Sequence, residues 1–293
     1  MMRETEILSL PPTAHKALLA LATYRFLTVH QMLRLRVAKD EGNLRKNLNR
    51  MLSAKRDGTG LSRPKEIGVL DFGVLVGKGR LSRLYFLTPR GAEALKRADR
   101  DAPDAVPVKH AVRFQNDYQH RVSTVDFHIT LSQFAEAQEH EITMSQQYFS
   151  WTQKAGKAPA RPETSIDLRP GYIDPDSTYM LTGPDGTERL LLVEIANGHK
   201  VGRVVEKLEK YAQAIDSLAI NTAFDYGDRA PRVLWLFEHQ RTLELVQKRA
   251  QSNRWVSSHV PYFFLRTLDS CTHPALRSGW LQPTTDAAEV ALF

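Results

Sequence analysis

Two unbroken apolar runs constrain the fold of this chain more than any other feature. Residues 190–195 (LLLVEI) and 233–237 (VLWLF) flank an amphipathic helical pattern at 201–215. Continuous apolar runs are typical of strands buried on both faces of a sheet, and a helix between two such strands is typical of a parallel crossover. The sequence therefore predicts an α/β unit with a sheet covered by helices on both faces.

The flanking patterns extend this unit in both directions. We expect an α-β-β-β-α-β order with an additional helix and strand at the end. The helices are expected at 115–138, 201–215 and 241–251, and the strands at 142–149, 171–181, 188–195, 232–237 and 260–268. Such an order predicts a mixed sheet flanked by helices.

The first 100 residues are the basic part of the chain. They contain 20 Lys and Arg residues and 9 Asp and Glu residues, whereas the remainder contains 20 and 24. Such an uneven distribution favours an anionic partner, most often nucleic acid, although basic surfaces also serve solubility.

Helical periodicity in this basic part predicts three helices. Residues 11–35 have apolar side chains at helical spacing up to a break where Thr28 can cap a second, short helix. In the third helix, within 40–52, Leu44 and Leu48 belong to an apolar face. The other face carries side chains that reach phosphates and base edges, namely Arg45, Lys46, Asn49 and Arg50. This succession is typical of a helix-turn-helix domain.

Two β-prone runs within 68–87 flank the turn Gly77-Lys78-Gly79 and predict a basic hairpin. Its cationic residues are Lys78, Arg80 and Arg83. A basic hairpin after a recognition helix is typical of a wing that lies along the phosphate backbone, and residues 87–98 predict a closing helix. We therefore expect a winged-helix domain at 1–100 that binds double-stranded DNA.

The remaining features bound the class of protein. Residues 98–110 are charged and rich in Pro and Ala, which predicts a linker at 101–112 and a second domain at 113–293. The single Cys271 excludes an intramolecular disulfide, and no apolar run approaches the roughly 18 residues of a membrane span. We expect a cytoplasmic protein without a membrane partner.

The order of the elements, with acids at the ends of the second and third strands, resembles the PD-(D/E)xK nuclease fold. More narrowly, residues 12–283 resemble the replication-relaxation family of plasmid and mobile-element proteins, in which a winged helix precedes a nuclease-like domain. The matching stretches are LTPRG, PDSTYML, EIANG, KLEKY, VLWLF and HPALRSGW. The resemblance implies DNA processing and plasmid transfer.

A metal-dependent nuclease needs two or three oxygen ligands for Mg²⁺ or Mn²⁺ and a lysine near the attacked phosphate. Asp176 follows Pro175 as the nuclease motif requires, and Asp174 lies two residues earlier, on the same face of an extended strand. Glu194 ends the neighbouring predicted strand. We therefore expect all three acids as metal ligands, with Asp176 and Glu194 also catalytic.

The lysine of the nuclease signature is missing, because Ala196 stands two residues after Glu194. The replication-relaxation pattern has an acid there, which Ala196 does not supply either. Lys207 on the following helix is the better substitute, since Lys210 falls on the solvent side of that helix. The alternative is that both lysines only pair with neighbouring glutamates on the surface.

His120 matches a histidine that the family carries on its first core helix, which makes it a further catalytic candidate, although lone histidines are often structural. The sequence lacks the clustered histidines of three-histidine relaxases. Tyr179 and Tyr211 are therefore interpreted as packing residues.

Two functions are consistent with these patterns. The first is relaxase-like, metal-dependent nicking of DNA at an origin. The alternative is a catalytically inactive DNA-binding regulator or relaxosome accessory protein, which Ala196 favours. A homodimer and partners among relaxosome or plasmid-transfer proteins are open for both.

Overall fold

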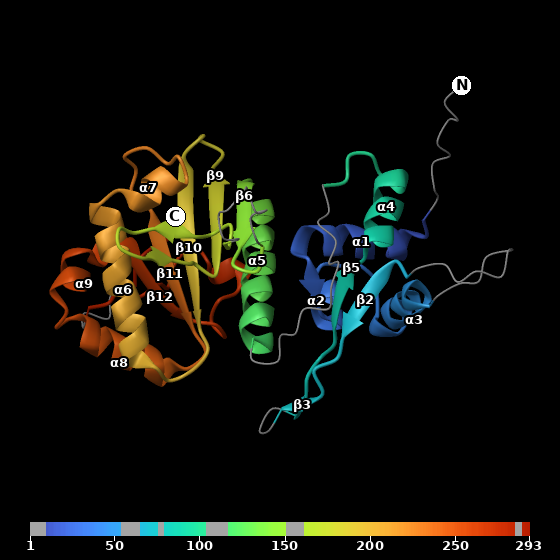
Figure 1. Cartoon of the computed structure of the whole chain (residues 1–293), viewed down its shortest axis with the longest axis horizontal. Coiled ribbons are helices and arrows are strands. Elements are labelled where there is room, and N and C mark those ends of the chain that lie inside the picture. Colours follow the sequence, from blue (N-terminus) through green and yellow to red (C-terminus); the bar gives the residue numbers. More distant parts are fainter. Residues whose placement is uncertain (1–9, 54–64, 76–78, 104–116, 151–160, 285–288) are drawn as a thin grey trace, which may run out of the picture. The chain divides into compact units, whose positions relative to one another are not determined.

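The computed structural model describes residues 10–53, 65–75, 79–103, 117–150, 161–284 and 289–293. Contacts divide the chain into two compact units, Met1–Ile129 and Thr130–Phe293, and the division falls inside helix α5 (Tyr118–Ala137). Figure 1 shows the elements of both units. Among the described residues, no helix is long and apolar enough to span a membrane.

Unit 1 is a small α/β unit. Its elements, before the first residues of α5, are α1 (Pro12–Tyr24), β1 (Phe26–Leu27), α2 (Val29–Arg34), α3 (Glu41–Leu52), β2 (Ile67–Leu70), β3 (Val74–Leu75), β4 (Gly79–Arg80), β5 (Leu84–Leu87) and α4 (Pro89–Ala98). Strands β1, β5 and β2 form an antiparallel sheet in that order, and β3 pairs with β4.

Capping residues set the helix starts in unit 1. Thr28 caps α2 as predicted, because its side chain accepts from the Gln31 amide while the Gln31 side chain accepts from the Thr28 amide. Asp40 caps α3 in the simpler way, by accepting from the Asn43 amide. The predicted amphipathic α3 is confirmed, since Leu44 and Leu48 are fully buried.

The first part of α5 packs within unit 1. Gln31 Nε2 donates to the Val122 carbonyl oxygen at 3.1 Å, and Arg34 forms an ion pair with Asp126 at 2.7 Å. The contact division therefore lies later in the chain than the predicted linker at 101–112, most of which falls outside the described residues. The domain boundaries stay predictions.

Unit 2 contains a five-stranded sheet and its helices. After α5 its elements are β6 (Glu141–Gln147), β7 (Ile166–Asp167), β8 (Tyr172–Ile173), β9 (Ser177–Thr182), β10 (Glu188–Ala196), α6 (Val201–Asp216), α7 (Ala219–Ala223), β11 (Arg232–Phe237), α8 (Gln240–Ala250), α9 (Arg254–Ser258), a 3₁₀ turn (Val260–Tyr262), β12 (Phe263–Thr267) and a second 3₁₀ turn (His273–Ala275).

The main sheet has the order β12-β11-β10-β9-β6. Strands β10, β11 and β12 are parallel, and β9 is antiparallel to both β10 and β6. The prediction of an α/β chain with a mixed sheet flanked by helices is thus confirmed.

The two apolar runs are buried on both faces of this sheet. On one face, Leu192 of β10 and Trp235 of β11 join a core with Leu208 of α6 and Leu243 of α8. On the opposite face, Trp280 packs edge to face against Phe264, with ring centroids 6.4 Å apart. Both faces are therefore covered, as continuous apolar strands require.

The predicted strand at 171–181 is wrong as one element. It forms two separate strands, β8 and β9, with residues 174–176 between them. Pro175 has no amide hydrogen to donate to a strand ladder, which accounts for the interruption. Strand β8 pairs instead with β7, a short strand that the sequence patterns did not predict.

The glycine of the LTPRG stretch, Gly91, lies where two backbone segments of unit 1 approach each other closely. A Cβ atom at Gly91 would lie 2.0 Å from the carbonyl oxygen of Glu66. That oxygen is held by Thr88, whose amide and hydroxyl donate to it at 3.2 and 2.9 Å. The backbone just before β2 and the start of α4 therefore approach too closely for any side chain at this position.

We expect Gly91→Ala to lower the free energy of unfolding of unit 1 by about 1–3 kcal/mol or more, because the backbone at Glu66 must shift to make room for the methyl group. Thermal unfolding followed by circular dichroism measures the change. Gly42→Ala is the matched control: it lies on the exposed surface of α3, where a Cβ meets only the Asp40 side chain at 3.3 Å. Because that contact is with the oxygen that caps α3, the gain in helix propensity is partly offset, and the net change should stay within about 1 kcal/mol in either direction. Equal effects of the two substitutions would contradict the close approach.

Candidate functional site

The candidate site is built on the neighbouring strands β9 and β10. Ser177, the first residue of β9, pairs with Val193 of β10. The Asp176 amide continues this ladder by donating to the Val193 carbonyl oxygen at 2.9 Å. The register therefore places Asp176 across from Glu194, at the edge of the sheet where β9 begins and its antiparallel neighbour β10 ends.

Glu194 is a carboxylate on the packed face of the sheet. Strand alternation puts it on the same face as Leu190 and Leu192, which belong to the core beneath α6, and it is only 3 % exposed. The Tyr211 hydroxyl donates to Oε1 at 2.5 Å, and Lys207 Nζ lies 2.6 and 2.7 Å from the two carboxylate oxygens. Both oxygens of this buried acid are therefore bonded.

Helix α6 supplies both partners of Glu194. Lys207 and Tyr211 are four residues apart, so they lie on one face of the helix. Lys207 Nζ also donates to the Asp174 carbonyl oxygen at 2.9 Å. Tyr211 is fully buried, as its interpretation as a packing residue requires, but that interpretation missed its hydrogen bond to the acid. The spacing from Lys207 was the signal available in the sequence.

The two aspartates differ in their environment. Asp176 is 7 % exposed, and its Oδ2 accepts from the Ile195 amide at 2.6 Å. Asp174 is partly buried, and its Oδ1 is enclosed without a hydrogen-bond partner among the described residues. A buried carboxylate oxygen without a donor is costly, so it needs a cation, a water molecule or a ligand.

Burial dominates the electrostatics of these groups. It raises the pKa of Glu194 to about 7; nearby Lys207 works against this rise and the Asp176 carboxylate adds to it. Burial also lowers the pKa of Lys207, but the Glu194 and Asp176 carboxylates outweigh this effect and leave that pKa above its ordinary value. Burial and Glu194 raise the pKa of Tyr211 well above its ordinary value, which keeps its hydroxyl a donor.

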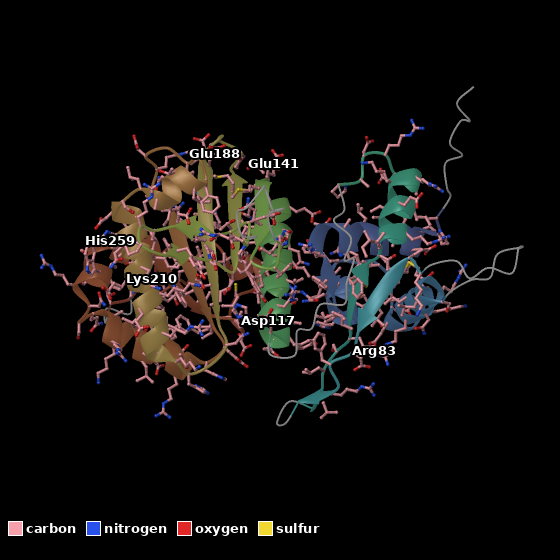
Figure 2. All side chains as sticks on the ribbon, viewed as in Figure 1. Arg83, Asp117, Glu141, Glu188, Lys210 and His259 are labelled. Carbon is pink, nitrogen blue, oxygen red and sulfur yellow. The ribbon has the colours of Figure 1, made fainter. Side chains whose placement is uncertain are left out.

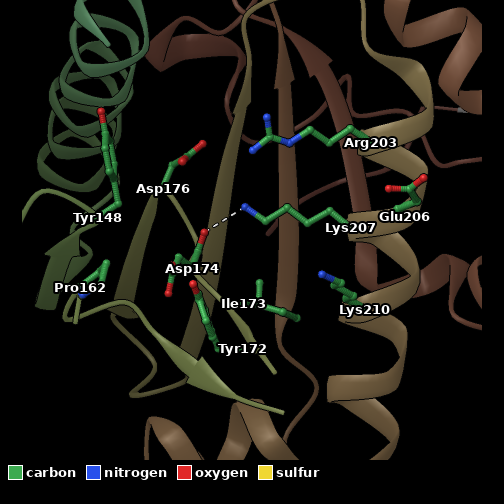
Figure 3. Close-up of a pocket in the computed structure, with 10 residues that line it drawn as sticks. All are labelled: Tyr148, Pro162, Tyr172, Ile173, Asp174, Asp176, Arg203, Glu206, Lys207 and Lys210. Carbon is green, nitrogen blue, oxygen red and sulfur yellow. Dashed lines mark hydrogen bonds between the residues drawn. The ribbon is translucent and has the colours of Figure 1, made fainter. Parts of the chain in front are cut away.

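The two aspartates open onto a cavity of about 600 Å³ (Figure 3). Side chains of α6 line one side, and Figure 3 shows Arg203 and Lys207 extending from the helix toward the segment that carries the aspartates. The lining residues are Tyr148, Pro162, Tyr172, Ile173, Asp174, Asp176, Arg203, Glu206, Lys207 and Lys210. The sequence patterns did not single out Arg203, Tyr148 or Tyr172, which carry no motif of their own.

The other predicted catalytic residue lies in the other unit. His120 belongs to the first part of α5, within unit 1, where its carbonyl oxygen accepts from the Thr124 hydroxyl at 2.9 Å. Ala196 ends β10 and packs against the core beneath α6. The catalytic role of His120 stays a prediction.

The predicted DNA-binding residues lie on two elements of unit 1. Arg45, Lys46, Asn49 and Arg50 are all exposed on α3, and Arg45 pairs with Glu41 one turn earlier. Arg80 and Arg83, the latter labelled in Figure 2, both contact Asp71 Oδ2, at 3.4 and 3.0 Å. Lys78 lies outside the described residues.

No group of three or more His, Cys, Asp or Glu side chains is arranged to hold a metal ion in the described parts of the chain. Comparison of the chain with protein-family models, with curated proteins and with solved structures finds no match. The site is therefore interpreted from its own geometry.

The Glu194–Lys207 pair predicts a pH-dependent stability. Between pH 4.5 and about 7, folded Glu194 keeps a proton that the unfolded chain releases, so its contribution to stability falls as the pH rises. Lys207→Ala removes the compensating cation. We expect the substitution to lower the free energy of unfolding by roughly 3 kcal/mol at pH 8, and by less at pH 5, where the acid is protonated.

Chemical denaturation followed by tryptophan fluorescence, with a chelator present, measures this difference. All four tryptophans of the chain lie in unit 2, so the signal reports the unit that contains the pair. Lys210→Ala is the matched control, because Lys210 is an exposed lysine on the same helix. A Lys207→Ala deficit that is the same at both pH values would contradict the buried ion pair.

Proposed function

We propose that this protein binds duplex DNA through a winged helix in unit 1 and nicks one DNA strand at the aspartate site of unit 2. The observation that carries the proposal is the convergence of Asp176, Glu194 and Lys207 at one edge of the sheet. A pair of acids with a lysine is the constellation that metal-dependent phosphodiester cleavage requires.

Element order and exposure support the winged helix. Three helices are followed by the β2–β5 hairpin and by α4, and α3 buries its apolar side chains while four DNA-contacting types stay exposed. In this proposal α3 enters the major groove, and the hairpin lies along the phosphates. Asp71 contacts both Arg80 and Arg83. It neutralises part of their charge and orients their guanidinium groups.

The succession α5-β6-β9-β10-α6-β11 supports a PD-(D/E)xK-like arrangement for unit 2. In that arrangement, Lys207 on α6 takes the place of the strand lysine that Ala196 does not provide. Its ammonium group reaches Glu194 from the helix side at 2.6 Å. The proposed membership of the replication-relaxation family rests on the same correspondence.

The aspartates fit a hard divalent cation such as Mg²⁺ or Mn²⁺. Mg²⁺ is held by one or two carboxylates together with water and substrate phosphate oxygens. Asp176 and Asp174, whose Oδ1 has no hydrogen-bond partner among the described residues, would hold it. Glu194 would join only by giving up a bond to Lys207 or Tyr211. A bound ion would supply charge stabilisation at the phosphate and a more acidic water molecule.

The residues of the chain have their own parts in this proposal. The Ile195 amide fixes the Asp176 carboxylate at the cavity, so it is oriented before DNA binds. Lys207 holds the Glu194 charge and the Asp174 backbone in one position. Arg203 lines the cavity as a further cation for a phosphate group.

A catalytically inactive DNA-binding regulator or relaxosome accessory protein is the second candidate. One observation favours it: Lys207 and Tyr211 already satisfy both oxygens of Glu194 without a metal ion. A cytoplasmic location, a homodimer and contacts with plasmid-transfer proteins belong to both candidates as proposals.

The winged-helix proposal predicts the effect of substitutions on α3. Arg50→Ala should weaken binding to duplex DNA and reduce the slope of log K against log salt by about one unit, because one phosphate contact is lost. Fluorescence anisotropy over a salt series measures both quantities. Arg254→Ala, which removes an exposed arginine on α9, should leave both unchanged. Unchanged duplex affinity in Arg50→Ala, Arg45→Ala and Arg80→Ala together would refute the interface.

The nicking proposal predicts metal-dependent relaxation of supercoiled plasmid. Asp176→Asn should reduce the rate by at least about 100-fold, since even outer-shell partners of metal sites are worth 10–100-fold, while duplex binding stays intact. Asp185→Asn is the control, because Asp185 lies in an exposed turn, where it accepts hydrogen bonds from Thr187. If the wild type binds duplex DNA but leaves plasmid supercoiled with either Mg²⁺ or Mn²⁺, the regulator is the better assignment.

A further inference from the structure

The cavity at the aspartates has two sides of different chemistry. Arg203, Lys207 and Lys210 of α6 line one side, and Tyr148 and Tyr172 line it from outside that helix (Figure 3). The three cations are at positions i, i+4 and i+7, so they lie along one face of the helix over roughly 10 Å. Cations in a row opposite aromatic rings are the combination by which proteins hold single-stranded nucleic acid.

Tyr172 is exposed although it is a large aromatic residue. It is 55 % exposed, more than any other large aromatic residue in the described parts of the chain. Its backbone is fixed by pairing with Asp167 in the β7–β8 hairpin, and Arg161 lies over its ring, 5.5 Å from Cζ to the centroid. Arg161 in turn pairs with Asp167. One face of a positioned ring is thus covered by a cation, and the side chain remains open to solvent.

The positive charges that line the cavity are balanced by negative ones, so charge alone does not explain the binding of a ligand there. Its three cations are balanced by Asp174, Asp176 and Glu206, and Lys207 is already bonded to Glu194. Arg203 and Lys210 are exposed and have no ion-pair partner among the described residues. They can contact phosphates, but most of the affinity has to come from contacts other than charge.

We propose that this cavity binds an unpaired DNA strand, with a base stacked on Tyr172 and phosphates along Arg203 and Lys210. Bases in a duplex are stacked on their neighbours, so a single exposed ring selects unpaired nucleotides. The inference rests on the proposed function that the chain acts on DNA. It adds that the strand which reaches the aspartates is unpaired.

The experiment separates base stacking from phosphate contacts. The full chain, in the presence of a chelator, is titrated against a labelled oligothymidylate of about 12 nucleotides and against a strand of equal length made of abasic sites. Fluorescence anisotropy gives both affinities. The wild type should prefer the base-bearing strand by roughly tenfold, because base–aromatic stacking has this magnitude. Tyr172→Ala should abolish the preference, and Tyr172→Phe should keep it.

Matched controls assign the effect to the cavity. Trp255→Ala removes another exposed aromatic ring, on α9 outside the cavity, and should leave the preference unchanged. Arg203→Ala and Lys210→Ala should weaken binding of both strands alike and reduce the salt slope by about 0.7 each. Lys248→Ala, an exposed lysine on α8, should not.

The outcomes distinguish this inference from the proposed function. Equal affinity of the wild type for base-bearing and abasic strands, or a preference that survives Tyr172→Ala, would overturn it. Loss of duplex binding in Arg50→Ala and loss of nicking in Asp176→Asn test the proposed function instead. A preference that depends on Tyr172 in a protein that does not nick would support the strand site and refute only the nuclease activity.

Discussion

The buried charge of Glu194 determines the arrangement of the sheet edge around it. A carboxylate among Leu190, Leu192 and the apolar face of α6 is tolerable only with a cation and full hydrogen bonding. Lys207 and Tyr211 provide both, and they fix α6 to β10 in one register. Because apolar residues of similar volume would often stabilise a fold as well or better, the pair is not explained by stability alone, which agrees with the proposed function.

The elements with strong local signals were predictable. Strands β10 and β11 are recognisable as continuous apolar runs, because burial on both faces of the sheet leaves no polar alternation. Helix α6 is recognisable from the helical spacing of its apolar residues. The amphipathic α3 and the Thr28 cap of α2 were predictable in the same way. Helical periodicity alone was enough to predict that Lys207 lies nearer the apolar face of α6 than Lys210 does.

The parts that depend on distant contacts were not predictable. The split of residues 171–181 is decided by Pro175 together with the pairing of β8 to β7, and β7 is too short to have a periodic pattern. The spacing from Lys207 indicates which face of α6 carries Tyr211, but its hydrogen bond to Glu194 joins residues 17 apart in sequence and depends on how α6 packs on β10. Arg203 and Tyr172 lie at the cavity because of tertiary packing, and neither has a local signature that distinguishes it from surface residues.

The lysine beside Glu194 comes from helix α6 and not from strand β10, which carries the acid and ends at Ala196. On a strand, the lysine would be tied to the acid by the alternation of side chains, and any shift by one residue would move it to the opposite face. On α6, it depends on the helix packing and is independent of position 196. The distance between the acid and the lysine is therefore set by the packing of α6 on the sheet, and the side chain at position 196 has no part in it.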